Sequence, residues 1–512
     1  MDYSGLSDAE QLLIKAFPDG SWLDLRSNAG PDDDGVNWGA ERIIRAEVIA
    51  SLLLGAVTPK RGKIAAIRLR GAKVTGRLDL MGATVAYALV CEQCYFDDPP
   101  RFVEATVKTI WISDSRLPGM DAARMRVDGV LDLHGSSLGG PLVLGRASIS
   151  AEVNLSAVVI DSGANGAAIA AEGLSTDGNL DCGKVEARGQ RGTPVLVVDG
   201  SVIGTEIDLI RACIQGEVEA RAIRVGGRVH LQHAMLDNGS GTALRLTRSA
   251  ITGDVLCDDT TVIGKIRMVG TTLGGSLFLR KSRLQNPGKY ALDAPQLEAK
   301  ELYLMPADVQ GIVGLNNARI GVLLDDPLRW PAELEIDGLT YDALNPQLTA
   351  RERLDWLARD IRVRQPQKYE QLAAYFARIG QPADARRVMY AKECHQRPAK
   401  GRLSRAWGIL QDITVGYGYR PWRAVLWFAA LLAIGSAVYA VSPPPALTPA
   451  AAPHFNPVGY TLDLLLPVVN LGQKYAFNPG GLEQWLSYLL VAAGWVLATT
   501  ITAGIARVLT RR

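Results

Sequence analysis

The chain has 512 residues, more than one ordinary hydrophobic core holds, so the sequence predicts two or more structural units. Glycine is frequent, at 52 residues, whereas aromatic residues make up only 6%. This balance favours short strands and tight turns over a helical globule. The formal net charge of +2 argues against a general nucleic-acid-binding protein, so no nucleic-acid partner is expected.

The first residues of the chain contain no basic segment, no long apolar run and no small-residue cleavage site. We therefore expect no secretory signal peptide, and we expect the first part of the chain in the cytoplasm. Within residues 40–54, apolar side chains recur at helical spacing, and Gly55 ends this pattern. This pattern predicts an amphipathic helix within an N-terminal helical cap, residues 1–60, that covers the first coil of a repeat.

The repeat occupies residues 61–325 and has the form apolar–any–Gly–any–apolar–any–apolar, as in residues 74–80. Several copies lie 11 residues apart, for example at Gly253, Gly264 and Gly275. The alternation turns one side of each short strand inward, and glycine permits a sharp corner or a close backbone approach. One such strand cannot bury its inner face alone. The repeat therefore predicts a mostly β fold, a β-solenoid (β-helix) of stacked coils.

Beyond residue 349 the apolar period changes from two to about 3.6, so residues 326–400 are predicted to form a helical neck. Pro366 begins one predicted helix, which ends near Gly380, and Pro382 begins another. Between residues 351 and 405 there are 14 Lys or Arg against 6 Asp or Glu, a net charge of +8. Two interpretations are open: a solvated helical surface, or contact with anionic lipid headgroups next to a membrane span.

Residues 401–512 are predicted to form a membrane module. Two uncharged or nearly uncharged segments, residues 424–441 and 485–509, are long enough to cross a bilayer as helices. Arg423 lies at the start of the first segment and Arg507 near the end of the second. The positive-inside rule then places both chain ends in the cytoplasm. The sequence therefore predicts a multi-pass protein of the cytoplasmic (inner) membrane with a two-helix transmembrane hairpin.

Residues 459–473, between the two predicted spans, form an apolar stretch that is too short to cross a bilayer and is broken by Pro467. The stretch is predicted to be re-entrant or interfacial. Asp463 is the only acidic residue from 442 to 481, and its carboxylate is functional if it lies at membrane depth but merely faces water at an interface. Both readings stay open. The candidate pore or re-entrant site consists of Asp463, Asn470, Gly472 and Gln473, and homo-oligomers are expected because two spans cannot enclose a passage.

Cys91 and Cys94 form a Cys-x-x-Cys pair, which is a candidate redox pair. The alternative is a pair of solenoid thiols, because the predicted strand and turn lack the helix N-terminus that lowers a thiol pKa. The sequence contains no dinucleotide fingerprint, no phosphate-binding loop, no second cysteine pair at zinc spacing and no recognisable nucleophilic triad. It therefore predicts no catalytic residue, no cofactor and no metal site, and nothing in it indicates an enzyme.

Several sequence phrases recur or stand out: the Gly-x-Leu-Asp-Leu repeats and residues 38–42, 353–357, 369–373 and 416–421. Together they resemble a bacterial family usually labelled membrane-associated oxidoreductase. The resemblance covers nearly the whole chain and implies a β-solenoid joined to a membrane module. The label implies redox activity but assigns it to no residue.

The last 100 or so residues are also similar to two-span pore-loop ion channels. The shared order is one span, a re-entrant stretch with residues 470–473, and a glycine-containing span that ends in basic residues. The Thr-Val-Gly-Tyr-Gly filter of potassium channels is missing, and Gly416-Tyr417-Gly418 precedes the first span. Three hypotheses follow: a sensor or scaffold with a channel-like oligomeric module and a cytoplasmic partner or ligand, a channel gated by the solenoid, or a membrane-associated oxidoreductase.

Overall fold

The computed structural model divides into two compact units, one formed by Met1–Leu348 with Asp355–Val363 and the other by Thr349–Leu354 with Arg364–Arg512. The division falls within the predicted neck. The phrase at residues 416–421 lies outside the described residues. The structure describes residues 5–26, 38–161, 166–362, 365–396, 422–448 and 452–509, without the side chains of residues 396, 422 and 500–509.

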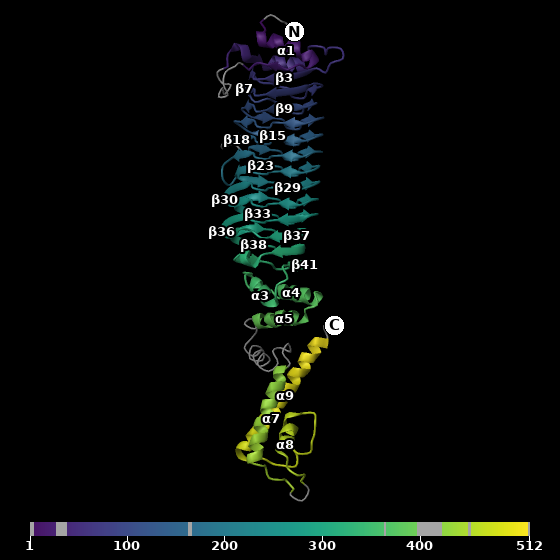
Figure 1. Ribbon diagram of the computed structural model, residues 1–512, viewed down its shortest axis with the longest axis vertical. Helices are drawn as coiled ribbons and strands as arrows, with labels where there is room; N and C mark the ends of the chain where they lie inside the picture. The colour runs from purple at the N-terminus through teal and green to yellow at the C-terminus, as the bar shows by residue number, and fades with distance from the viewer. Residues whose placement is uncertain are drawn as a thin grey trace. The chain divides into compact units, whose positions relative to one another are not determined.

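The first unit is a β-solenoid of about 13 turns, from the N-terminal strands to β41 (Thr340–Asn345) (Figure 1). Arg126 pairs in parallel register with Ser148, 22 residues further on, and this distance is one turn. The 11-residue step in the sequence is therefore half a turn. Four short strands make up such a turn, two in each sheet: β12 (Arg126–Val127), β13 (Leu131–Asp132), β14 (Ser137–Leu138) and β15 (Leu142–Val143).

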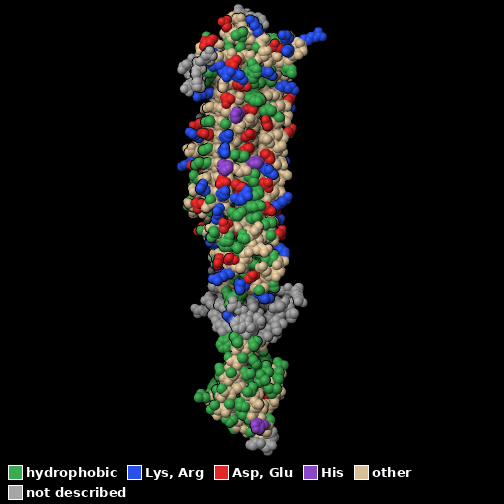
Figure 2. Space-filling model, in the orientation of Figure 1, with side chains coloured by type: hydrophobic (Ala, Val, Ile, Leu, Met, Phe, Trp, Pro, Cys, Tyr) green, Lys and Arg blue, Asp and Glu red, His purple; other side chains and the backbone are tan. Residues whose placement is uncertain are grey.

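The core lies inside these turns and consists of the alternating apolar residues that the repeat predicts. Leu131, Leu142, Val153 and Leu180, from strands of neighbouring turns, are each at most 1% exposed. Figure 2 shows charged side chains of both signs spread over the visible face of the solenoid. Many of them pair across adjacent turns, as Arg280 does with Asp258 at 2.6 Å. The prediction of a β-solenoid is therefore confirmed.

The corners of the turns use fewer glycines than the repeat predicts. Fifteen non-glycine residues have φ between 48° and 59°, among them Gln93, Asp114 and His233. Most glycines of the repeated phrase instead allow the backbones of two adjacent turns to lie close together. A Cβ on Gly204, for example, would overlap the backbone carbonyl of Asp177 in the preceding turn. Stacking of the turns, rather than residue type, therefore holds most corners in the left-handed region.

Replacing Gly204 by alanine should weaken the solenoid. We expect Gly204→Ala to lower the free energy of unfolding by about 1–3 kcal/mol, because the new methyl group overlaps backbone that cannot rotate away. Gly145→Ala is the matched control, since the nearest atom to its Cβ is the Glu172 carboxylate at 3.8 Å. Chemical unfolding followed by circular dichroism measures both. Equal destabilisation by the two variants would contradict the steric explanation.

Two helices lie in the N-terminal part of the first unit, α1 (Asp8–Ala16) and α2 (Ala46–Leu53). The predicted helix over residues 40–54 is wrong in its first half. Residues Ile43–Arg45 form strand β2, because their backbone pairs with β4 (Lys73–Thr75) of the next turn. Only the part from Ala46 on is α-helical.

Glu10 fastens α1 to β2. Its carboxylate receives hydrogen bonds from the Nε and Nη2 of Arg45 at 2.8 Å each, and the side chain is 2% exposed. Burial raises the pKa of Glu10, but the bonds from Arg45 and Ser7 outweigh it and hold that pKa below 4.5. The folded pKa is thus the lower one. The pair contributes stability above pH 4.5 and loses that contribution as pH falls through the folded pKa.

Glu10→Gln should therefore destabilise the protein most at neutral pH. The difference in unfolding free energy between Glu10→Gln and wild type should shrink steadily as the pH falls below 4.5. Urea titrations at several pH values measure this difference. Glu47→Gln removes an exposed carboxylate that also contacts Arg45, at 3.1 Å, and should change little at any pH. A pH-independent difference for Glu10→Gln would contradict the linkage.

The second unit is helical. It contains α4 (Gln367–Arg378) and α5 (Pro382–Gln396), which match the two predicted neck helices, and Lys392 of α5 pairs with Glu370 of α4. Helix α3 (Ala350–Leu357) lies at the division between the units. The remaining helices are α7 (Trp422–Val441), α8 (Pro457–Leu465) and α9 (Gly481–Leu509).

Within the described residues, α7 is the one helix that is long and apolar enough to cross a membrane, over Arg423–Val441. Most of its side chains are exposed, unlike those of a core helix in a soluble protein. Figure 2 shows hydrophobic side chains over most of the visible face of the α7–α9 part. Helix α9 covers the second predicted span and extends beyond it. The two-helix transmembrane hairpin itself stays a prediction.

Candidate functional site

Helix α8 lies against both long helices of the second unit (Figure 1). Asn456 begins it, because the side-chain oxygen accepts the N–H groups of Val458 and Gly459 at 3.0 Å each. Pro457 occupies the first helical position, where no backbone donor is needed. A buried apolar cluster holds the three helices together: Tyr439, Tyr460, Leu464, Leu465, Phe477 and Leu490.

Two glycines allow this close packing. Gly435 of α7 lies against Thr461, and Gly494 of α9 lies against the backbone carbonyl of Leu465, the last residue of α8. A Cβ at either position would overlap these atoms. Gly494 is 13 residues beyond Gly481, the first residue of α9. At about 1.5 Å per residue, α8 therefore ends roughly 20 Å along α9.

The carboxylate of Asp463 holds the segment after α8. Oδ1 accepts the backbone N–H of Leu471 at 2.8 Å, and Oδ2 accepts those of Gln473 at 2.9 Å and Lys474 at 2.8 Å. The side chain is 1% exposed. Asp463 therefore does not face water, so the interpretation in which its carboxylate faces water at an interface is wrong. We call residues 466–474 the clamped loop.

The structure brings the four predicted residues of this site together, but in different roles. Asn470 and Gly472 lie on the exposed side of the clamped loop, and the Asn470 side chain accepts the Gly472 N–H at 2.9 Å. Gln473 ties the loop to the segment before α8, because its Oε1 accepts the Asn456 N–H at 3.2 Å and its Nε2 donates to the carbonyl of His454 at 3.1 Å.

Sequence reasoning missed the part played by Asn456. The Asn-Pro pair at 456–457 was the signal for it, since this pair is typical of a helix start. The bond from Gln473 to the segment before α8 had no comparable signal.

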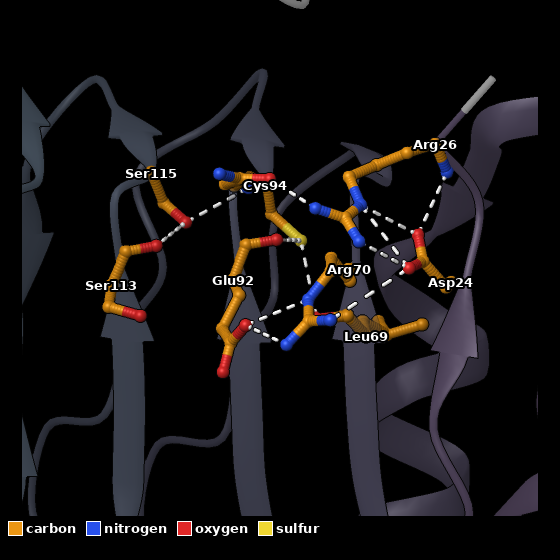
Figure 3. Close-up of polar contacts among 9 residues, drawn as sticks. Asp24, Arg26, Leu69, Arg70, Glu92, Cys94, Ser113 and Ser115 are labelled. Atoms are coloured by element: carbon orange, nitrogen blue, oxygen red, sulfur yellow. Dashed lines mark hydrogen bonds and ion pairs between the residues drawn. The ribbon is translucent and has the colours of Figure 1, made fainter. Parts of the chain in front are cut away.

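The two cysteines of the Cys-x-x-Cys pair lie in the solenoid. Cys91, in β6 (Ala88–Glu92), points into the core and is 0% exposed, and Cys94 is 2% exposed. The Cys94 thiol donates to the carbonyl of Glu92 at 3.3 Å, and its N–H donates to Ser115 Oγ at 3.0 Å (Figure 3). Ser115 makes the same local bond one turn later, to the carbonyl of Ser113 at 2.7 Å. Cys94 therefore fills a corner position that a serine fills in the next turn.

Charged residues cover this corner on its outer side (Figure 3). Arg70 pairs with Glu92, and Arg26 pairs with Asp24 at 2.7 Å. Inside, a hydrogen bond with the neighbouring Cys94 and full burial raise the pKa of Cys91 well above its usual value. Burial raises the pKa of Cys94, but hydrogen bonds from Cys91 and from the backbone of Ala72 and Gly71 outweigh it and lower that pKa. Burial of both thiols therefore decides the matter, because a thiol that no reagent can reach is a poor nucleophile whatever its pKa. This geometry favours the structural reading of the pair over the redox reading.

Native thiol reactivity should follow exposure. Cys213 is exposed and should react with iodoacetamide first, whereas Cys91, Cys94 and Cys257 should react only after unfolding in guanidinium. Burial and Asp258 raise the pKa of Cys257 to about 12, which adds to its protection. Mass spectrometry of the labelled peptides measures each site. Labelling of Cys91 or Cys94 in the native protein as fast as that of Cys213 would contradict the structural reading.

The described residues contain no group of three or more His, Cys, Asp or Glu side chains arranged to hold a metal ion. Comparison with known proteins finds no family model, no curated protein and no solved structure that matches the chain. The fold therefore defines the protein only as a β-solenoid with a helical C-terminal unit. The resemblance to the membrane-associated oxidoreductases stays a prediction.

Proposed function

We propose that this protein is a β-solenoid sensor or scaffold anchored to the cytoplasmic membrane by α7 and α9. The exposed apolar side chains of α7 support its insertion, and those of α9, such as Trp485, Leu489 and Trp495, support a second span. Arg423 and Arg507 support a topology with both chain ends in the cytoplasm, where the long side of the solenoid would be available to a partner. Helices α1 and α2 cover the first turn.

The contact between Gly494 of α9 and the end of α8 is the observation that carries the proposal further. If α9 enters the bilayer near residue 485, Gly494 lies about 14 Å deeper, close to the middle of a hydrocarbon core of roughly 30 Å. The last residue of α8, Leu465, packs against Gly494 and therefore lies at the same depth. The clamped loop then returns from the middle of the bilayer, so α8 and the loop form a re-entrant segment.

A re-entrant loop needs protein or water around it. Irregular backbone at this depth cannot face lipid, because its polar groups find no partners there. In a single chain, however, Val468, Val469 and Leu471 of this loop are 89%, 43% and 46% exposed. We therefore propose a homo-oligomer in which the clamped loops of several copies face one another around a water-filled centre.

Two measurements test this proposal on the full-length protein. The protein should be extracted from membranes by detergent and not by carbonate, and chemical cross-linking should yield one closed oligomer. A cysteine at Val468, in a background of Cys213→Ser and Cys394→Ser, should react with a membrane-impermeant maleimide added to the outside of cells. Extraction by carbonate, or a monomer in membranes, would overturn the proposal.

The second candidate function is an ion channel gated by the solenoid, and the polar backbone of the clamped loop favours it. Planar bilayers containing the purified oligomer test for conductance. The exposed arginines of the neck, Arg378, Arg386 and Arg387, support contact with anionic headgroups. Binding of residues 1–396 to vesicles should then require anionic lipid and fall with added salt.

A further inference from the structure

Strand β33 (Thr261–Arg267) carries two cationic side chains on the outer side of the solenoid. Lys265 and Arg267 alternate with the buried Ile266, so their side chains lie on the same, outer side. Arg245 of the preceding turn pairs in register with Arg267, and neighbouring strands lie about 5 Å apart. Lys265 therefore lies beside two guanidinium groups.

Two bulges shelter this part of β33. In the preceding turn, residues 238–241 form a bulge that packs on Gly264, and a Cβ on Gly264 would lie 2.8 Å from a carbonyl oxygen of this bulge. Lys289, in a second bulge one turn after β33, donates to Ser240 Oγ at 3.2 Å. This bond joins the turn before β33 to the turn after it, so the bulges meet over the strand. The Lys265 side chain is half-buried there.

The carboxylates near Lys265 already have partners. Glu217 accepts a hydrogen bond from Arg245 Nε at 2.6 Å, and Asp293 accepts one from Arg267 Nη1 at 2.9 Å. Among the described residues, the Lys265 ammonium makes no ion pair or hydrogen bond. Burial and the two guanidinium groups lower the pKa of Lys265, and the two carboxylates do not outweigh them. More of this amine is therefore neutral, and a neutral amine is a nucleophile.

The surroundings of this amine suit CO₂ as its electrophile. The amine nitrogen forms a bond to the carbon of CO₂ and releases a proton to water, which gives a carbamate and needs no oxidant or cofactor. Unlike an amide or an imine, a carbamate carries a negative carboxylate, which guanidinium groups bind through paired N–H donors. Such donors remain, since Nη1 and Nη2 of Arg245 and Nε and Nη2 of Arg267 donate to no described residue.

We infer that Lys265 takes up CO₂ as a carbamate whose carboxylate is held between Arg245 and Arg267. The reaction places an anion where the free chain has an amine or an ammonium group. It therefore makes the charge on this side of the solenoid depend on CO₂. This inference concerns the solenoid alone and holds whether or not α7 and α9 enter a membrane.

Trapping of the carbamate on the purified full-length protein tests this inference. The protein is kept in isotopically labelled bicarbonate near neutral pH and treated with triethyloxonium tetrafluoroborate, which ethylates carbamates, and its tryptic peptides are analysed by mass spectrometry. Lys265 should carry at least about tenfold more label than Lys289, because each unit by which a pKa falls raises the neutral fraction of an amine about tenfold. Lys289 is the internal control, since it is exposed and bonded to Ser240.

Two arginine variants separate the effect of the cluster from general lysine reactivity. Arg267→Gln removes one of the two guanidinium groups and should lower the labelling of Lys265 about tenfold. Arg280→Gln removes an arginine from a similar pair across turns, with Asp258 at 2.6 Å, and should leave the labelling unchanged. Circular dichroism checks that both variants are folded, and the comparison of Lys265 with Lys289 in wild type needs no variant. Absence of label from Lys265, equal labelling of the two lysines, or equal labelling in the two folded variants overturns the carbamate site.

Discussion

Asp463→Asn should release the clamped loop while leaving the solenoid intact. An asparagine keeps one acceptor oxygen but turns an NH₂ group toward at least one of the three N–H donors that now bind the carboxylate. Each buried donor that loses a charged partner costs about 1.5–3 kcal/mol. The variant should therefore lose most of the clamp, although it differs from wild type by a single group.

Limited proteolysis measures this release. Trypsin should cut after Lys474 much faster in Asp463→Asn than in wild type, because the Lys474 N–H is one of the three donors that the clamp holds. The peptide that ends at Lys474 identifies the cut by mass spectrometry. Glu483→Gln is the matched control, since it removes a nearby carboxylate whose side chain makes no part of the clamp. Equal cleavage rates in wild type and Asp463→Asn would show that the carboxylate does not hold the loop.

The solenoid could be predicted from sequence because its physics is local. Alternating apolar residues such as Leu78 and Leu80 determine which side of a strand is buried, and the same alternation recurs in each turn. The length of a turn could not be predicted, because both halves of each turn carry the same 11-residue phrase. Residues 238–241 form a bulge inside strand β30 (Met235–Arg245), where the register with the strand of the next turn shifts. The Asn238 side chain closes this bulge by donating to the carbonyl of Thr242 at 2.5 Å.

The candidate site was predictable in its residue types but not in its geometry. An isolated acid in an apolar stretch marked Asp463 as important. Its actual partners are backbone N–H groups 8 to 11 residues later, and backbone groups carry no sequence signature. The Cys-x-x-Cys spacing had the opposite weakness. The two residue types and their spacing indicate redox chemistry. The burial of Cys91 and Cys94 in a corner of the solenoid, which argues against that chemistry, depends on packing against neighbouring turns and cannot be read from the spacing.

Gly494→Leu should displace α8 from between the two long helices. A side chain at this position overlaps the backbone carbonyl, carbon and Cα of Leu465, and backbone at a helix end cannot rotate away as a side chain does. Overpacking of this kind costs about 1–3 kcal/mol. Because Asp463 is two residues before Leu465 in α8, displacement of the helix should also open the clamp and expose Lys474 to trypsin.

Gly494→Ala separates this steric effect from helix propensity. In the interior of a helix, alanine is more favourable than glycine by about 1 kcal/mol, so propensity alone predicts that Gly494→Ala stabilises α9. The contact with Leu465 predicts the opposite sign, together with faster cleavage at Lys474. Gly480→Ala, where no heavy atom lies within 4 Å of the new Cβ, is the control and should leave cleavage unchanged. Stabilisation by Gly494→Ala with an intact clamp would mean that α8 does not rest on α9 at this depth, and the re-entrant segment would lose its physical basis.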